Sequence, residues 1–178
     1  MTDKRRFRRL ARTLHVLSVS ALVLIPVGIL SWLLSEGVTA ETVATRLPQF
    51  IAEEPLTTER LGLLIAVSLL PVLPALYTLE IMRQLFARYA GGDVISIQIA
   101  RLIQRIGLGM FILVAAQVVI HPIQGLLITW ANSQGNRMLS IALSESDIGL
   151  LLAAGLVTLI GWAMAEAHRI AEENRSFV

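Results

Sequence analysis

The sequence LHVLSVSALVLIPVGILSWLL, from Leu14 to Leu34, decides the fold class of this chain. His15 is its only ionisable residue. A helix that crosses the roughly 30 Å hydrocarbon core of a bilayer needs about 20 consecutive apolar residues, and this stretch is long enough. The basic residues before it and VTA at Val38 to Ala40 also loosely resemble a cleaved signal peptide. Because the apolar run is longer than the core of an ordinary signal peptide, we expect a retained transmembrane helix.

Three more apolar runs of similar length follow along the chain, over residues 61–79, 106–124 and 148–165. The middle one has no ionisable residue up to Ile120 and then includes His121, whereas the other two carry no charged side chain. The 178 residues are 55% hydrophobic and 16% charged, while a soluble domain is about a quarter charged. These features predict an all-α membrane protein in which the whole chain forms one bundle of four transmembrane helices.

Lysine and arginine residues are concentrated in alternate connections between the apolar runs. Six precede the first run, four lie between the second and the third, and two follow the fourth, whereas the other connections hold only three. Connections that are rich in Lys and Arg remain on the cytoplasmic side of a membrane. We therefore expect both termini to be cytoplasmic, and the first and third connections to face outward.

A helical hairpin is predicted on the cytoplasmic side, over about residues 80–105. The helical pattern of the second run continues past Leu79 as EIMRQLFARYAGGD, until the pair Gly91–Gly92 ends it. The next helix can be capped by Ser96 or Asp93. Beyond the fourth run, residues 166–178 continue as a charged helical tail on the same side of the membrane.

Proline and small residues indicate how the spans bend and pack. Pro71 and Pro74 remove two backbone donors from the second run and predict a kink, which we interpret as a tolerated bend, with a gating hinge as the alternative. Small residues recur at four-residue spacing in the last run, which favours close packing within the bundle over a dimer interface. These residues are Gly149, Ala153, Ala154, Thr158, Gly161 and Ala165.

The two outward connections have different local patterns. Residues 40–47 predict a short amphipathic helix that Pro48 stops. In the later connection, Leu139, Ile141 and Leu143 alternate with small polar or apolar residues, which suggests a short strand. A single strand is not stable, so it would need a partner in one of the outer loops or in another subunit.

No pattern in the chain predicts catalysis, a metal site or a cofactor. There is no cysteine, which excludes disulfides and thiolate metal sites. No span has an ionisable residue near its centre, which argues against ion or proton transport. We considered His15 and His168 as haem ligands, since both lie near the inner surface, but we interpret them and His121 as polar anchors at the interface. Phosphate-loop, zinc-protease and nucleophile-elbow motifs are absent. We therefore expect no enzymatic activity.

The basic residues of the first twelve positions are interpreted as a topology signal that also contacts anionic lipid headgroups. Nucleic-acid binding is the alternative, but the run is short, contains one aromatic residue, Phe7, and lies beside the membrane. We therefore expect no direct contact with nucleic acid.

Two segments resemble a family of small bacterial four-pass membrane proteins, catalogued as domain-of-unknown-function family 2975. They are LFARYAGGDVISIQIARLIQRIGLGM, over residues 85–110, and the closing AEAHRIAEENRSFV, over residues 165–178. The segment LSIALSESDIGLLLAAGLV, over residues 139–157, also fits the family, while Val94 and Ile95 stand where it often has an aromatic residue. The resemblance implies a bacterial inner-membrane protein and, as a possible partner, a small helix-turn-helix regulator.

The hairpin and the tail are the basis of the functional hypothesis. We expect a regulatory or protein-interaction component of the membrane, in which carboxylates of the tail pair with arginines of the hairpin. The candidate interaction residues are Arg88, Arg101, Arg105, Glu166, Arg169, Glu173 and Phe177. The alternatives are a carrier for a small apolar or amphipathic molecule, which the kinked second span motivates, and a structural subunit or homo-oligomer.

Overall fold

The computed structural model describes residues 2–35, 39–53, 55–132, 139–141 and 143–176, and the regular structure within these ranges is helical. The helices are α1 (Thr2–Ser35), α2 (Ala40–Arg46), α3 (Thr58–Leu69), α4 (Val72–Gly91), α5 (Ile97–Thr129) and α6 (Glu145–Ser176). Four helical segments are long and apolar enough to cross a membrane, with α3 and α4 together forming one of them. The prediction of an all-α chain with four apolar spans is confirmed.

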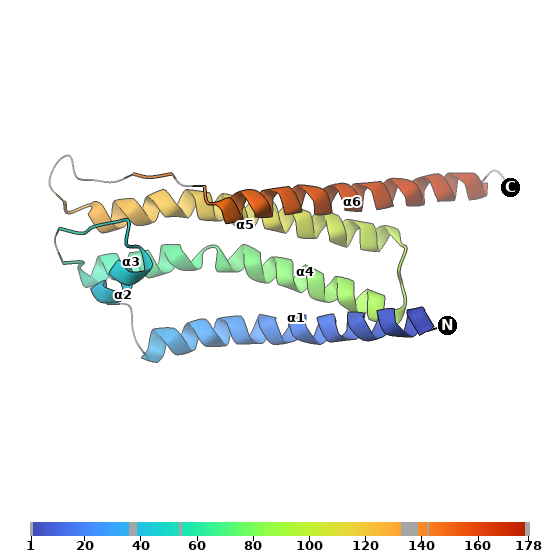
Figure 1. Cartoon of the computed structure of the whole chain (residues 1–178), viewed down its shortest axis with the longest axis horizontal. Helices are drawn as coiled ribbons and strands as arrows, with labels where there is room; N and C mark the ends of the chain where they lie inside the picture. Colours follow the sequence, from blue (N-terminus) through green and yellow to red (C-terminus); the bar gives the residue numbers. More distant parts are fainter. Residues whose placement is uncertain (1, 36–38, 54, 133–138, 142, 177–178) are drawn as a thin grey trace.

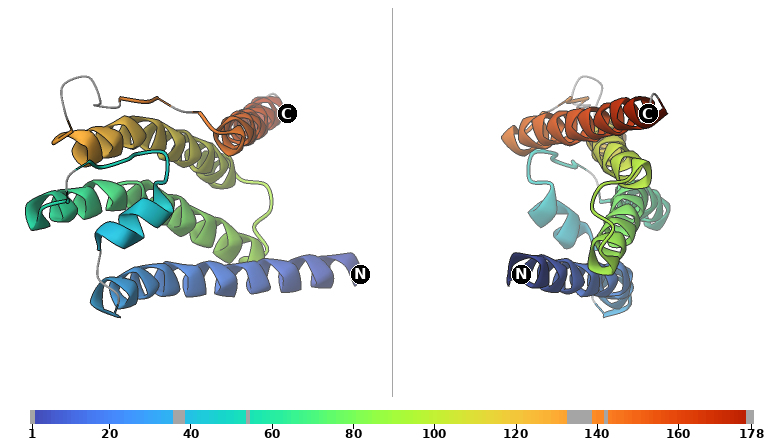
Figure 2. Two further views of the ribbon diagram at one scale, coloured as in Figure 1. Left: turned by 60° about the vertical axis from the view of Figure 1, so that its left-hand side comes forward. Right: turned by 90° about the vertical axis from the view of Figure 1, so that its right-hand side faces the viewer.

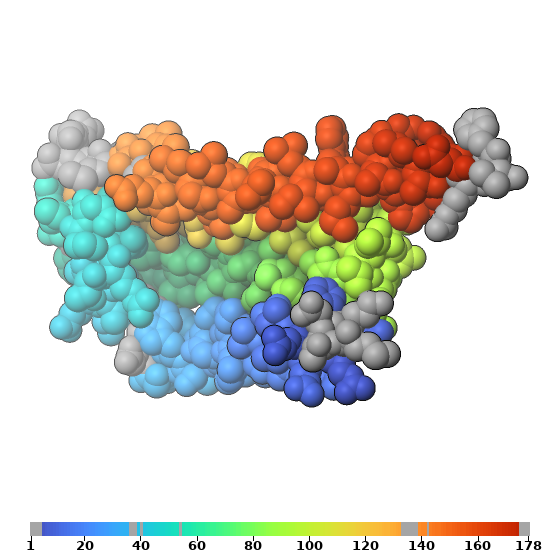
Figure 3. All heavy atoms as spheres, turned by 45° about the vertical axis from the view of Figure 1, so that its right-hand side comes forward, coloured from blue at the N-terminus to red at the C-terminus, as the bar shows by residue number. Residues whose placement is uncertain are grey.

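The four long segments form a row rather than a closed ring (Figure 1). In the part of the chain that the structure describes, α1 packs on α4, α4 on α5 and α5 on α6, whereas α1 and α6 do not pack on one another. The row curves, and α2 lies on its inner side (Figure 2). In a space-filling view α6 and α1 form two raised edges, with α4 and α5 recessed between them (Figure 3). The bundle is therefore open along one side.

Both termini and the α4–α5 turn lie at one end of the molecule, which we call the termini end. The opposite end carries α2 and the connections that precede α3 and α6, and we call it the loop end. This arrangement follows from an even number of antiparallel spans. It places the predicted hairpin and the tail at the same end.

Helices α5 and α6 approach closely because glycine faces the partner helix at two points. A Cβ atom on Gly161 would lie 2.8 Å from the backbone nitrogen of Gln104 and 3.0 Å from the carbonyl oxygen of Ala100. A Cβ atom on Gly107 would clash with the hydroxyl of Thr158 and lie 2.9 Å from the carbonyl oxygen of Ala154. The small residues of the last span therefore pack within the bundle, as predicted, although Gly149 faces open space.

The basic N-terminal segment is helical and packs on α4, which the sequence analysis did not foresee. The rings of Phe7 and Tyr89 meet edge to face with their centroids 5.5 Å apart. One helical turn further along, Ala11 is buried. The ring nitrogen Nδ1 of His15 donates a hydrogen bond of 3.1 Å to the carbonyl oxygen of Arg83. Side chains that lie between and after the basic residues of this segment thus hold α1 against α4.

Helix α2 closes the loop end, as residues 40–47 predicted. Thr39 caps it by accepting a 3.3 Å hydrogen bond from the backbone nitrogen of Thr42. A small apolar core lies beneath it, formed by Val43, Phe50, Leu64 and Ile128. The side chain of Asn132 fastens the following connection to the end of α5, because it donates to the carbonyl oxygen of Ile51 (2.8 Å) and accepts from the backbone nitrogen of Glu53 (3.0 Å).

The second span breaks at Pro71, as the two prolines predicted. Helix α3 ends at Leu69 and α4 begins at Val72, and the backbone nitrogen of Leu70 bonds the carbonyl oxygen of Val67 over three residues instead of four.

The strand predicted over residues 139–144 is not formed among its described residues, which have no regular secondary structure. The reason is that no described strand lies beside it to complete a ladder.

Replacing Gly161 with alanine should destabilise the protein by about 1–3 kcal/mol, because the new methyl group meets backbone atoms of α5 that cannot move aside. Gly149→Ala is the matched control on the same helix, since nothing lies within 4 Å of that site. The measurement is thermal unfolding in detergent, followed by tryptophan fluorescence. Equal midpoints for the two variants would contradict the close contact.

Candidate functional site

The turn between α4 and α5 is closed by local hydrogen bonds. Gly92 ends α4 with a φ of 93°, a conformation that favours glycine. The backbone nitrogens of Gly92 and Asp93 bond back to the carbonyl oxygens of Tyr89 and Arg88, both at 3.1 Å. Ser96 caps α5 by accepting a 3.3 Å bond from the backbone nitrogen of Ile99. The hairpin predicted for residues 80–105 is thus present, with both of its helix ends satisfied.

Arg88 contacts residues beside this turn rather than residues of the tail. It donates a hydrogen bond to the side chain of Gln98 and lies 3.7 Å from the carboxylate of Asp93. Arg101 and Arg105 point from successive turns of α5, and both are exposed. Neither forms an ion pair with any residue whose side chain the structure describes. Their charges are therefore available to another molecule.

The charged tail pairs with itself. Arg169 donates to Glu166 at 2.5 and 3.0 Å and to Glu173 at 2.8 Å, while His168 lies 3.7 Å from Glu172. These are pairs between residues three and four positions apart, which are neighbours on a helix surface. They are exposed to solvent and contribute little to stability.

The predicted pairing of the tail with the hairpin is wrong for the described residues. No ion pair there joins Glu166, Glu172 or Glu173 to an arginine of the hairpin. The physical reason is proximity along the helix, since Arg169 already lies within reach of two of these carboxylates. Phe177 lies outside the described residues, so its predicted role is not addressed by the structure.

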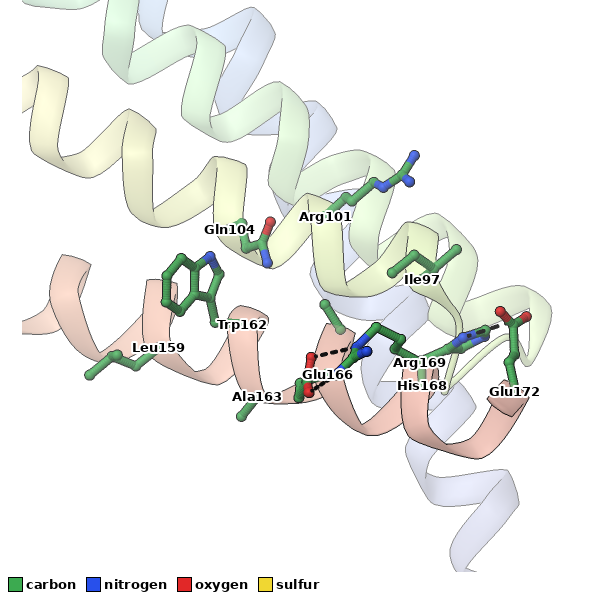
Figure 4. Close-up of a pocket in the computed structure, with 11 residues that line it drawn as sticks. Ile97, Arg101, Gln104, Leu159, Trp162, Ala163, Glu166, His168, Arg169 and Glu172 are labelled. Atoms are coloured by element: carbon green, nitrogen blue, oxygen red, sulfur yellow. Dashed lines mark hydrogen bonds and ion pairs between the residues drawn. The ribbon is translucent and has the colours of Figure 1, made fainter. Parts of the chain in front are cut away.

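A groove of about 940 Å³ lies between α5 and α6 at the termini end (Figure 4). Arg101 and Gln104 stand on its α5 wall, and Trp162 and Glu166 stand on its α6 wall, with Arg169 further along. The groove thus brings together three of the predicted interaction residues, Arg101, Glu166 and Arg169. Arg88, Arg105 and Glu173 are not part of its lining.

Sequence reasoning missed most of the groove. Trp162 was not among the predicted interaction residues, and its side chain is 69% exposed beside the groove. The available signal was helical spacing: residues 97, 101 and 104 share a face of α5, and residues 159, 162 and 166 share a face of α6. What could not be read from the spacing was that these two faces adjoin.

No family model, curated protein or solved structure matches the chain. The resemblance to family 2975 therefore stays a prediction. Among the described residues, no group of three or more His, Cys, Asp or Glu side chains is arranged to hold a metal ion.

Replacing Arg169 with glutamine should loosen the last turns of α6 without changing the bundle. Both local ion pairs are lost, so hydrogen exchange of the backbone amides in residues 166–174 should become about two- to fivefold faster. Arg105→Gln is the control, because Arg105 has no ion pair with a described residue. Unchanged exchange in the Arg169 variant would show that the pairs do not hold the helix.

Proposed function

We propose that this chain is a multi-pass membrane protein that binds a protein partner at its termini end and acts as a regulatory or interaction component of the membrane. The observation that carries the proposal is the groove between α5 and α6, which Arg101 lines from α5 and the exposed Trp162 lines from α6. The guanidinium of Arg101 points away from α6 (Figure 4) and forms no ion pair with a described residue. Tryptophan and arginine are the residues that most often dominate the binding energy of protein interfaces.

We propose further that the termini end faces the cytoplasm of a bacterium and that the membrane is the inner membrane. The support is the charge asymmetry, since twelve of the fifteen Lys and Arg residues belong to segments at this end. A helix-turn-helix regulator is the partner that the resemblance to family 2975 suggests. The proposal involves binding alone and no catalytic step.

The orientation can be measured with reporters. A fluorescent protein fused after Val178 should fluoresce, because it would fold in the cytoplasm. Alkaline phosphatase inserted at Ser140, in the connection before α6, should be active, because that enzyme requires the oxidising periplasm. The opposite pair of results would place the groove on the outer face and remove the proposed partner class.

The groove can be tested by photocrosslinking in living cells. A benzoylphenylalanine at position 162 should form an adduct with a cytoplasmic protein, to be identified by mass spectrometry. Arg101→Glu in the same chain should reduce the adduct by about tenfold, because reversing a charge inside an interface costs on the order of 1–2 kcal/mol.

Two controls accompany this experiment. Arg88→Glu lies outside the groove lining and should leave the adduct unchanged. The same crosslinker at Leu152, which is 71% exposed in the apolar part of α6, should capture no cytoplasmic protein. Protein adducts of equal yield at positions 152 and 162, or none at 162, would overturn the proposed function.

A further inference from the structure

Helix α6 begins far from the end of α5. Gly161 lies beside residues 100–104 of α5. Because the two helices are antiparallel, residues earlier in α6 lie beside residues later in α5. Glu145, sixteen residues earlier, therefore lies level with about residues 116–120. Since α5 continues to Thr129, its last turns have no α6 beside them, which Figure 1 also shows.

A second pocket, of about 360 Å³, lies where α6 begins beside α5. Its α5 wall presents a polar stripe at helical spacing, Gln117, His121 and Gln124. Ser144 and Asp147 line it from the start of α6, and Ser68 and Pro71 line it from the break in the second span. Three segments thus direct polar groups into one space.

The depth of this stripe is what requires an explanation. Gln117 is eleven residues beyond Ile106 and thirteen before Trp130, which corresponds to about 16 and 20 Å along a helix. It therefore lies in the interior of an apolar span, where an amide without hydrogen bonds costs several kcal/mol. Gln124 donates a 2.8 Å bond to Ser68, but Gln117 bonds to no residue that the structure describes. Gln117 is exposed in the protein alone, so within a membrane its amide needs a hydrogen-bond partner from outside the described residues.

The lining carries a negative charge. Asp147 is its one carboxylate, and neither lysine nor arginine is among the lining residues that the structure describes. The oxygen Oδ2 of Asp147 accepts from the backbone nitrogen (2.8 Å) and the hydroxyl (2.7 Å) of Ser144, whereas Oδ1 accepts from no described residue. The positive end of the α6 dipole would favour anions, but Glu145 and Asp147 in the first turn oppose it.

We propose that this pocket is a hydrated vestibule, open at the loop end, that binds small ammonium-bearing molecules. Oδ1 of Asp147 accepts from the ammonium group, and the amide oxygens of Gln117 and Gln124 accept its remaining hydrogen bonds. The site is separate from the groove at the termini end. The proposal of this site does not depend on the proposed protein partner.

The absence of cysteine from the chain makes a direct test possible. Gln117→Cys and Val119→Cys are each reconstituted in lipid nanodiscs, which leave both membrane faces open to reagent. Val119 is 59% exposed and lies on the opposite face of α5 at nearly the same depth. Each variant is treated with a trimethylammonium methanethiosulfonate and with its sulfonate counterpart, and the labelling rates are compared.

The cysteine at position 117 should react about tenfold faster with the ammonium reagent than with the sulfonate, because a negative pocket concentrates cations. The cysteine at position 119 should react with neither reagent, because it faces hydrocarbon. Adding Asp147→Asn should remove the charge preference at position 117, while Asp147→Glu should retain it. No labelling at 117, equal labelling at 119, or a preference for the sulfonate would each overturn the vestibule.

Ligand binding is tested with ethylammonium as the probe. Leu143→Cys reports from the pocket lining while leaving Gln117, Gln124 and Asp147 in place. Ethylammonium should slow the labelling of this cysteine relative to sodium at equal ionic strength, and Asp147→Asn should abolish the protection. A hydrated pocket without protection would overturn the ammonium site.

Discussion

The close contact between α5 and α6 is the interaction on which the rest of the molecule depends. Glycine at positions 107 and 161 lets the two backbones approach at two separate points, and two such points define one register. That register places Trp162 beside Gln104 and forms the groove at the termini end. It also leaves α6 short of the end of α5 and so forms the pocket at the loop end. Both sites therefore follow from the register in which α6 packs on α5.

Four hydroxyl groups within the spans form the same kind of hydrogen bond. The hydroxyls of Ser18, Thr78, Thr129 and Thr158 each donate to the carbonyl oxygen four residues earlier, at 2.7 or 2.8 Å. Such bonds keep a hydroxyl paired inside hydrocarbon without any contact between helices. A glutamine side chain is too long and has too many donors and acceptors for this solution. For this reason Gln117 differs from the hydroxyl-bearing residues.

The two ends of the molecule differ in how their charges are used. At the termini end, Arg169 and Arg88 are engaged by neighbours on the same helix or turn, whereas Arg101, Arg105 and the exposed arginines of α1 form no ion pair with a described residue. At the loop end, Arg46 lies over the ring of Trp32 with 5.1 Å between the guanidinium carbon and the ring centroid. Charge that is already paired locally adds little to recognition. Counting charges along the chain therefore overstates what a partner would meet.

Composition and periodicity alone determined the helical class, the four apolar spans, the helix α2, the break at Pro71 and the hairpin turn at Gly92. Each of these depends on residues near one another in the chain, or on the cost of exposing backbone to hydrocarbon. Tertiary structure alone decided that Phe7 and His15 hold α1 to α4, and that the row of spans is open. It also decided which arginines remain unpaired and which faces of α5 and α6 adjoin. These features depend on register between helices, and register is set by close contacts that no periodicity within one helix specifies.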